Sequence, residues 1–463
     1  MSDYQVIVIG AGPGGYVAAI KCARLGLKTA IVESRDVGGT CLNRGCIPTK
    51  SLLHSAEVYH AVTHSEALGI STGAVSFDFA KMHEKKAEVV TKLRTGVEGL
   101  LAANKIDILR GTGVIQGPGS VLVGENTYLA DNIIIATGSI PAKPPIPGLE
   151  LEGVITSDEL LEKTDAFDPS LVIIGGGVIG VEFASVYATL GCSVTVVEAM
   201  PRILPTLDAD IAQNLNMNLR KKGVKVNAGA MVKQIVKDED GLTVEFEAKG
   251  KMQSVKAGKV LVAIGRRPNT AGLFGEGFSL EMERGRIVTN DKFETSVPGI
   301  YAIGDVCSKI QLAHVASCQG IAVAEIIAGH APTIRLDLVP SCIYTSPEIA
   351  SIGMTEAEAA EKGIAVKTGK FMMHGNGKTI IAGGERGFIK VVCDAQNGKV
   401  LGAQLMCERA TDMLSEITTA IVGGMTVEQM QNVVRPHPTF NEGVTEAFED
   451  VTGQSIHSAP PKK

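Results

Sequence analysis

A strand, a glycine-rich turn and a helix are predicted twice in this chain, in the runs "VIVIGAGPGGYVAA" and "LVIIGGGVIGVEFAS". In each run an apolar strand leads into the spacing G-x-G-x-x-G, which opens a helix. The glycines are Gly10, Gly12 and Gly15 in the first copy and Gly175, Gly177 and Gly180 in the second. A second strand follows each copy and ends on an acid, Glu33 or Glu198, at the same distance from the first glycine. This internal repeat predicts two doubly wound, Rossmann-like α/β domains.

Each repeat has the residues that dinucleotide binding requires. Glycines let the backbone turn tightly and approach a pyrophosphate at the helix N-terminus, and the acid accepts a hydrogen bond from a ribose. Glycines that served only helix–strand packing would not account for two complete units with matching acids. In the second unit a 2′-phosphate would be repelled by Glu198, and only Arg202 lies close by in sequence to offset that charge. NAD is therefore favoured over NADP.

The composition is that of a globular protein. The 463 residues are 45% apolar and 20% charged, with a formal net charge of −6. A negative chain is a poor match for nucleic acid, and no apolar run is long enough to cross a bilayer. The N-terminus leads almost directly into the first strand and leaves no room for a signal peptide, so we expect a cytoplasmic location. From about Leu338 the pattern predicts a third domain, of α+β type.

Two of the nine cysteines, Cys41 and Cys46, stand five residues apart in "GGTCLNRGCIPTK". In a straight helix their Cα atoms would be roughly 8–9 Å apart, whereas a disulfide needs about 7 Å or less. If the two cysteines are bonded, the segment cannot be regular helix throughout. Gly45 supplies the freedom for a break, and Pro48 restrains Ile47.

The cysteine pair could be a structural bridge, a metal site, two buried fillers or a redox couple. A bridge this short removes little entropy from the unfolded chain. A zinc site usually needs four ligands, and no second Cys/His pair stands out, so no metal is predicted. The other cysteines lie among apolar neighbours and are interpreted as buried residues. Because two bound dinucleotides would carry electron pairs, the redox couple is the favoured interpretation.

These features resemble the pyridine nucleotide–disulfide oxidoreductase family, class I, over the whole chain. The cysteine motif is especially close to that of the branch of the family that oxidises dihydrolipoamide. The resemblance implies FAD in the first unit, NAD in the second, and a homodimer whose active sites are shared between subunits. The implied domains are residues 1–145 (FAD-binding, first part), 146–270 (NAD-binding), 271–337 (FAD-binding, central part) and 338–463 (C-terminal interface domain).

The resemblance also implies catalytic roles in the two nucleotide-binding units. Cys41 matches the thiol that meets the dithiol substrate, and Cys46 matches the thiol that lies against the flavin and relays electrons to it. Lys50 matches a lysine beside the flavin, and Glu182 matches its carboxylate partner.

Near the C-terminus, "RPHPTFNE" resembles the acid/base motif of the family. His437 matches the acid/base, which suits a histidine because its reference pKa is about 6.5, and Glu442 matches the carboxylate that orients it. Many relatives carry a histidine where this chain has Arg435. The tail "SIHSAPPKK" finds no family match and is interpreted as flexible.

Further positions match cofactor-binding residues of the family. At the flavin these are Gly113, Ala136, Thr137, Gly138, Asp305, Gln311, Leu312, Ala313 and His314, with Lys50, Glu33 and the first set of glycines. Beside NAD these are Val232 and Gly265, with Glu182, Glu198 and the second set of glycines.

The activity that the resemblance implies is oxidation of protein-bound dihydrolipoamide to lipoamide, with reduction of NAD⁺ to NADH. The expected partner is a lipoyl-bearing protein, either the E2 component of a 2-oxoacid dehydrogenase complex or the H protein of the glycine cleavage system. One alternative is another NAD(P)H-dependent disulfide reductase of the glutathione reductase kind. A second is a flavoprotein that acts mainly as a structural component of a complex.

Overall fold

The computed structural model describes residues 2–162, 167–239, 241–384 and 386–459. The chain divides into two compact units, each drawn from stretches that are separate in the sequence. The first unit draws on the ranges 1–145, 154–167 and 261–336, and the second on 146–153, 168–260 and 337–463. Among the described helices, none combines the length and the apolar character that a membrane span requires.

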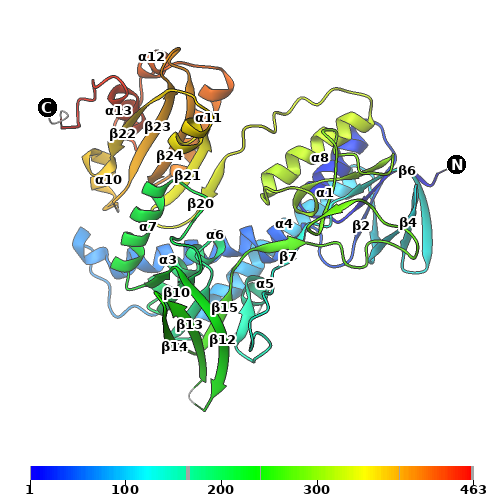
Figure 1. Ribbon diagram of the computed structural model, residues 1–463, viewed down its shortest axis with the longest axis horizontal. Coiled ribbons are helices and arrows are strands. Elements are labelled where there is room, and N and C mark those ends of the chain that lie inside the picture. The colour runs from blue at the N-terminus through cyan, green and yellow to red at the C-terminus, as the bar shows by residue number, and fades with distance from the viewer. Residues whose placement is uncertain (1, 163–166, 240, 385, 460–463) are drawn as a thin grey trace. The chain divides into compact units, whose positions relative to one another are not determined.

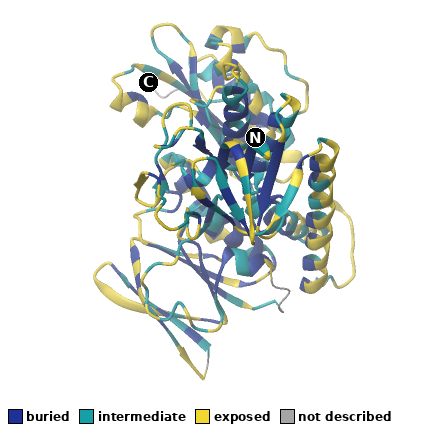
Figure 2. Ribbon diagram, turned by 90° about the vertical axis from the view of Figure 1, so that its right-hand side faces the viewer, coloured by how far each residue is buried: buried dark blue, intermediate teal, exposed yellow. Residues whose placement is uncertain are grey.

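A seven-stranded sheet forms the centre of the first unit. Its strands are β1 (Tyr4–Ile9), β2 (Thr29–Glu33), β3 (Asp107–Arg110), β4 (Gly113–Gly117), β5 (Ser120–Val123), β6 (Asn126–Ile135) and β19 (Ile300–Ala302). The parallel part runs β3-β2-β1-β6, with β19 also parallel to β6, while β5 and β4 continue from β6 as antiparallel strands. Val6, Ile7 and Val8 of β1 are fully buried, which explains why the strand is a continuous apolar run. Figure 2 shows buried strands near the N-terminus in dark blue.

The helices of the first unit carry much of the candidate site. They are α1 (Pro13–Arg24), α2 (Gly39–Arg44), α3 (Cys46–Thr63), α4 (Phe79–Ala103), α5 (Ser157–Glu162) and α8 (Ala313–Ile327), with the short 3₁₀ turns η1 (Ser65–Leu68) and η2 (Gly304–Val306). Within this unit α1 and α8 lie side by side (Figure 1). They approach closely because each has a glycine at the crossing: a Cβ on Gly320 would lie 2.6 Å from the carbonyl oxygen of Gly14.

Short strands complete the first unit. They are β7 (Ser139–Pro141) paired with β16 (Arg266–Pro268), β17 (Met282–Glu283) paired with β18 (Arg286–Ile287), and β8 (Val154–Thr156).

The second unit contains the second glycine repeat. Strands β9 (Ser170–Ile174), β10 (Ser193–Glu198) and β11 (Lys225–Ala228) are parallel in the order β11-β10-β9. Helix α6 (Val178–Thr189) follows β9, and α7 (Ala209–Lys221) precedes β11. An antiparallel sheet of β12 (Ala230–Asp238), β13 (Gly241–Ala248) and β14 (Lys251–Ala257) comes next. The chain then passes back into the first unit within β15 (Lys259–Val262).

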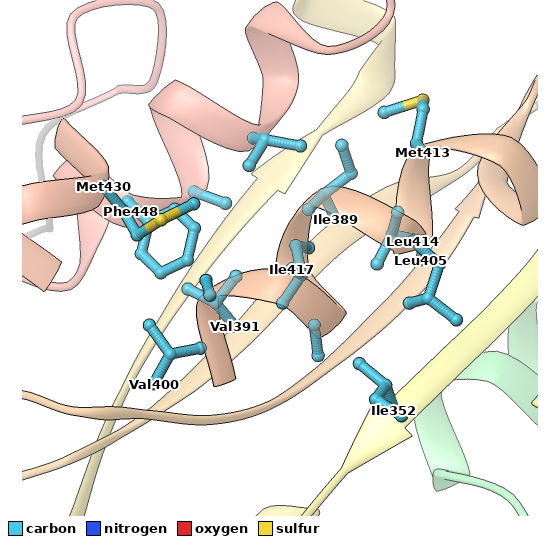
Figure 3. Packing of buried hydrophobic residues seen from close by; sticks show 14 of the residues in the cluster. Ile352, Ile389, Val391, Val400, Leu405, Met413, Leu414, Ile417, Met430 and Phe448 are labelled. Atoms are coloured by element: carbon cyan, nitrogen blue, oxygen red, sulfur yellow. The ribbon is translucent and has the colours of Figure 1, made fainter. Parts of the chain in front are cut away.

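The C-terminal part of the second unit is a five-stranded antiparallel sheet in the order β20-β21-β24-β23-β22. Its strands are β20 (Ser341–Ile343), β21 (Glu348–Gly353), β22 (Val366–Met372), β23 (Phe388–Asp394) and β24 (Val400–Cys407). Its helices are α9 (Glu356–Glu361), η3 (Met373–Gly375), α10 (Gly377–Ile381), α11 (Ala410–Val422), α12 (Val427–Gln431) and α13 (Glu442–Asp450). Ile389, Leu405, Ile417 and Phe448 pack into one apolar core between sheet and helices (Figure 3). The predicted fold class, two α/β dinucleotide-binding units with a C-terminal α+β domain, is confirmed.

Candidate active site

The two neighbouring cysteines lie on either side of a helix break. Helix α2 ends at Arg44 and α3 begins at Cys46, with Gly45 between them at φ −142° and ψ −110°. A Cβ on Gly45 would lie 3.0 Å from the carbonyl oxygen of Thr40. A side chain at this position would therefore be crowded, and the break that a Cys41–Cys46 bond requires lies at the glycine.

The side chains of Cys41 and Cys46 are thiols that are hydrogen-bonded to each other. That hydrogen bond, together with burial, raises the pKa of the Cys41 thiol above its ordinary value, while the charge of Lys50 acts in the opposite direction. The thiol of Cys41 also lies near Tyr16, whose pKa is raised by burial and by the charge of Cys41. The sulfurs are thus adjacent, as a dithiol–disulfide couple requires.

The segment that carries the cysteines is anchored to the first glycine turn. The N–H of Gly38 donates to the carbonyl oxygen of Ala11 at 2.8 Å. A Cβ on Gly39 would lie 2.6 Å from the Cα of Gly12, and Gly39 adopts a positive φ of 59°. The cysteine helix therefore starts in contact with the turn that would hold a pyrophosphate.

The first turn has a distinct local role for each of its glycines. Gly10 adopts φ +103°, and a Cβ there would meet the Ala136 carbonyl oxygen at 2.4 Å. A Cβ on Gly15 would lie 1.8 Å from the carbonyl oxygen of Gly10, so helix and strand touch at this point. At Gly12 the nearest atom would be the Cα of Gly39 at 3.9 Å. Gly12 thus leaves open space at the N-terminus of α1, where a phosphate group fits.

The second turn repeats this arrangement. Gly175 adopts φ +109°, and a Cβ on Gly180 would lie 2.0 Å from the Gly175 carbonyl oxygen. A Cβ on Gly177 would meet no protein atom within 4 Å. The same three local roles therefore recur, and the residues of both turns fit a dinucleotide.

The acids that end β2 and β10 are also equivalent. Glu33 accepts hydrogen bonds from the backbone N–H groups of Ala11 and Arg35, both at 2.8 Å. Glu198 accepts from Gly176 at 2.5 Å and from Met200 at 2.6 Å. Each carboxylate oxygen keeps a further lone pair, which a ribose hydroxyl could use.

Arg202, which could have offset a 2′-phosphate, is engaged within its own loop. Its guanidinium donates to the carbonyl oxygens of Leu207 at 2.9 Å and Pro205 at 3.2 Å.

Several of the predicted flavin contacts gather around the first turn. Ala136 donates its N–H to the carbonyl oxygen of Ile9 at 2.8 Å, directly after β6. Thr137 donates its hydroxyl to the Asn269 carbonyl oxygen at 2.7 Å. Gly138 follows at a positive φ of 68° with no protein atom near a Cβ.

Other predicted flavin contacts lie at the ends of β4 and α8. Gly113 opens β4, and a Cβ there would lie 3.0 Å from the side chain of Ile9. The segment 311–314 leads into α8, whose first residue is Ala313. Gly14 of α1 packs on Ala316 of the same helix. Gly113 therefore lies against the end of β1, and the start of α8 lies against α1.

Asp305 belongs to a buried polar group that sequence reasoning missed. It lies in η2 and accepts the hydroxyl hydrogen bond of Ser139 at 2.6 Å. Burial raises the pKa of the Asp305 carboxyl, while the Ser139 bond and the charge of Arg266 act in the opposite direction. Arg266 in turn donates to Ser139 and forms an ion pair with Asp158 at 2.9 Å. In the sequence, Ser139 of "IATGS" and Arg266 of "IGRRP" are polar residues next to predicted strands, and nothing indicates that they pair.

A network of ion pairs, which was not predicted from the sequence, connects α2 to neighbouring helices. Arg44, whose side chain is only 6% exposed, pairs with Asp36 at 3.0 Å and Glu162 at 3.1 Å. Asp36 also pairs with Arg94 of α4 at 3.1 Å, and Glu162 with Arg35 at 2.7 Å. The cysteine helix is thereby tied to α4 and α5.

Three predicted residues remain, two in the second unit and one in the first. Glu182 is buried on α6, and its carboxylate accepts the backbone N–H of Tyr344 at 2.9 Å. Val232 is buried in β12 at a bulge. Gly265, which belongs to the first unit, precedes β16 at φ +118°. The roles assigned to Glu182, Val232 and Gly265 stay predictions.

His437 and Glu442 form a hydrogen-bonded pair at the start of α13. Nδ1 of His437 lies 2.8 Å from Oε1 of Glu442, whose other oxygen accepts the backbone N–H of Thr439 at 2.8 Å. Burial acts to raise the pKa of Glu442, but the bonds from Thr439 and His437 hold it below its ordinary value. The His437 side chain is 78% exposed. With Nδ1 occupied, Nε2 is the nitrogen left to exchange a proton with a substrate.

The tail was expected to be flexible, but its described part is bound to α13. His457 Nδ1 lies 2.6 Å from Oε1 of Glu446, and Ser455 donates its hydroxyl to Oε2 of Glu446 at 2.7 Å. These two contacts explain why residues 455–457 stay close to the helix. Residues 460–463 lie outside the described part of the chain.

Two family models match the chain over most of its length. A model described as pyridine nucleotide-disulphide oxidoreductase matches residues 4–320, and one described as the dimerisation domain of the same family matches residues 339–448.

Curated relatives align from end to end. A dihydrolipoyl dehydrogenase of Bacillus subtilis (strain 168) is 42% identical, covering 98% of this chain and 99% of the relative. A dihydrolipoyl dehydrogenase of Thermus scotoductus is 43% identical, with 99% of each chain covered. Among solved structures, the HOCl-induced flavoprotein disulfide reductase RclA of Escherichia coli superposes with a TM-score of 0.86 at 30% identity, covering 96% of this chain and 99% of RclA.

Proposed function

The chain belongs to the pyridine nucleotide-disulphide oxidoreductase family, and we propose that it oxidises protein-bound dihydrolipoamide to lipoamide with FAD and NAD⁺ as cofactors. The observation that carries the proposal is the Cys41–Cys46 pair, two sulfurs in contact at a helix break, with α2 starting against the first dinucleotide turn. Full-length relatives described as dihydrolipoyl dehydrogenases support the choice of substrate.

The reaction begins at His437, in the proposed sequence of steps. Its Nε2 takes the proton of one substrate thiol, while Glu442 holds the ring through Nδ1 and stabilises the imidazolium. The substrate thiolate attacks Cys41 of the oxidised pair, the Cys41–Cys46 bond breaks, and Cys46 leaves as a thiolate. The second substrate thiol attacks the mixed disulfide, closes the lipoamide ring and releases Cys41.

The dithiol then has to be reoxidised. A bound FAD would supply the acceptor for the electron pair of the dithiol, and NAD⁺ would be the final acceptor of that pair as a hydride equivalent. Lys50 and Glu182 are assigned to the flavin site, where the lysine charge would favour electron density arriving from Cys46. The carboxylates of Glu33 and Glu198 would bind the ribose of each dinucleotide.

The match to a dimerisation domain supports a homodimer. We propose further that His437 of one subunit serves the cysteines of the other, which accords with its high exposure in the single chain. The lipoyl-bearing partner, the E2 component of a 2-oxoacid dehydrogenase complex or the glycine cleavage H protein, also stays a proposal, as does a cytoplasmic location.

The test is an anaerobic visible spectrum of the purified protein during titration with dihydrolipoamide, followed by NAD⁺. A long-wavelength thiolate–flavin band should develop and then disappear as NADH forms. A Cys46→Ser variant is the control, and its spectrum should not develop this band. If the flavin spectrum is unchanged by dihydrolipoamide but responds to another dithiol, dihydrolipoamide is not the substrate. The assignment of Cys41 and Cys46 as a redox pair would still hold.

A further inference from the structure

Arg435 is turned inward on an otherwise exposed segment. It lies between α12 and α13, two residues before His437. The neighbouring Val434 is 95% exposed, whereas the Arg435 side chain is 3% exposed. A guanidinium is costly to bury unless its N–H groups find partners, so its contacts should account for its burial.

The contacts of Arg435 come from three helices. Nε and Nη2 donate to Oε1 of Glu416 on α11, at 3.0 Å and 2.5 Å. Nη1 donates to the hydroxyl of Thr445 on α13 at 2.8 Å, and also to the carbonyl oxygens of Met430 at 3.4 Å and Val433 at 3.2 Å, around the end of α12. One side chain therefore ties α11, α12 and α13 together beneath the loop that carries His437.

The same network reaches the carboxylate partner of His437. The second oxygen of Glu416 accepts the side-chain N–H of Asn441 at 3.0 Å, and Asn441 directly precedes Glu442 at the start of α13. The 2.8 Å distance between His437 and Glu442 depends on where the loop lies relative to this helix end. Arg435 holds the loop that carries His437, and Glu416 links Arg435 to Asn441 at the start of the helix that carries Glu442.

We propose that Arg435 is a positioning residue, which holds His437 and Glu442 in register through a charge that does not titrate. This rests on the proposed function, in which His437 exchanges protons with the substrate. A guanidinium stays protonated throughout the working range of an enzyme. A histidine at this position would lose its charge near neutral pH.

The groups that contact Arg435 differ among the three helices. Glu416 is the carboxylate that faces it from α11, while the end of α12 offers backbone carbonyls and α13 offers a hydroxyl. The titratable pairs on α13 are Glu442 with His437 and, one turn on, Glu446 with His457.

The test uses Arg435→Met, Arg435→Lys and Arg435→His in the full-length flavoprotein. Arg110→Met is the matched control, since Arg110 also pairs with a glutamate at 2.8 Å but is 52% exposed in the other unit. Activity is measured from about pH 6 to about pH 8.5 and divided by that of the wild type at each pH. Reduction of ferricyanide by NADH, which bypasses the thiols, and the unfolding temperature are measured in parallel.

We expect Arg435→Met to lose roughly tenfold or more of its dihydrolipoamide activity at every pH, because the proton transfer is misaligned. Ferricyanide reduction should be unchanged. Arg435→Lys should recover part of the activity with a flat ratio, and the ratio for Arg435→His should fall as pH rises. Arg110→Met should match the wild type throughout.

The proposal is overturned if Arg435→Met lowers only the unfolding temperature and keeps wild-type turnover. A ratio for Arg435→His that does not change with pH would also overturn the role of the charge. The ratios of variant to wild-type activity are measured again with dithiothreitol as the dithiol. The role of Arg435 can then be tested even if dihydrolipoamide is not the preferred substrate. Failure of the wild type with dihydrolipoamide alone would count against the proposed function instead.

Discussion

Gly177 and Gly180 sit one helical turn apart in the second dinucleotide unit, yet an added methyl group should have opposite consequences at the two positions. At Gly177 a Cβ would meet no protein atom within 4 Å, and the backbone, at φ −74°, is one that alanine adopts readily. At Gly180 the same Cβ would lie 2.0 Å from the carbonyl oxygen of Gly175.

The magnitudes follow from these distances. Ordinary contacts of a Cβ lie at 3.4–4 Å, so alanine at Gly180 requires helix and strand to separate by more than an ångström. Overpacking of this kind costs about 1–3 kcal/mol or more. Alanine at Gly177 should change the free energy of unfolding by less than about 1 kcal/mol, since the loss of a glycine N-cap and the gain in chain stiffness are both small. That methyl group would instead occupy the space that a pyrophosphate needs.

The assay separates the two effects. Gly177→Ala should unfold at the wild-type temperature without nucleotide, retain its full flavin content, and bind NAD⁺ at least about tenfold more weakly, a loss of about 1.4 kcal/mol. Gly180→Ala should unfold at a lower temperature with or without NAD⁺. Unchanged NAD⁺ affinity in a folded Gly177→Ala protein would refute the assignment of this turn to the pyrophosphate.

Three further outcomes are expected. Cys46→Ser should lose more than about a hundredfold of dihydrolipoamide turnover, since no disulfide can form, and retain ferricyanide reduction by NADH; a loss of both would point to a damaged flavin site. Glu442→Gln should lower turnover by about tenfold or more, because the His437 ring is no longer held in place. If only the unfolding temperature changes, Glu442 does not orient His437 for catalysis. The contribution of the carboxylate to stability should be present above its unfolded pKa and lost as pH falls through the lowered folded pKa. His457, whose pKa is raised by Glu446, should contribute to tail binding fully below its unfolded pKa and lose that contribution as pH rises through the folded value. NMR titration of its ring protons would show this, with Glu446→Gln returning the titration to that of a free peptide.

The parts of the fold that could be predicted from sequence are those set by local chemistry. Both glycine turns and the helix break near Gly45 follow from residues close together in the chain, where a missing side chain permits one backbone path. The α/β class follows from the repeat itself. The activity came from a resemblance in the motif around Cys41, since spacing alone left the substrate of a redox pair undefined.

The contacts that could not be predicted join residues far apart in sequence. Ser139 and Asp305 are 166 positions apart, and Arg44 and Glu162 belong to separate stretches of the first unit. Sequence patterns do not predict such pairs, because the sequence does not show whether an arginine is buried or exposed in the folded chain. The inward orientation of Arg435 is of the same kind, because nothing in the sequence "NVVRPHP" indicates that this side chain contacts three helices.

The carboxylate of Glu198 has a consequence for anyone who would redesign the enzyme to use NADP. Both of its oxygens accept backbone N–H groups, one from the glycine turn at Gly176 and one from Met200 after the strand. Replacing it with a neutral or basic residue would admit a 2′-phosphate but would also strip the turn of its acceptor. A successful cofactor switch would therefore have to rebuild the loop together with the charge, and single substitutions at Glu198 should lose NAD⁺ before they gain NADP⁺.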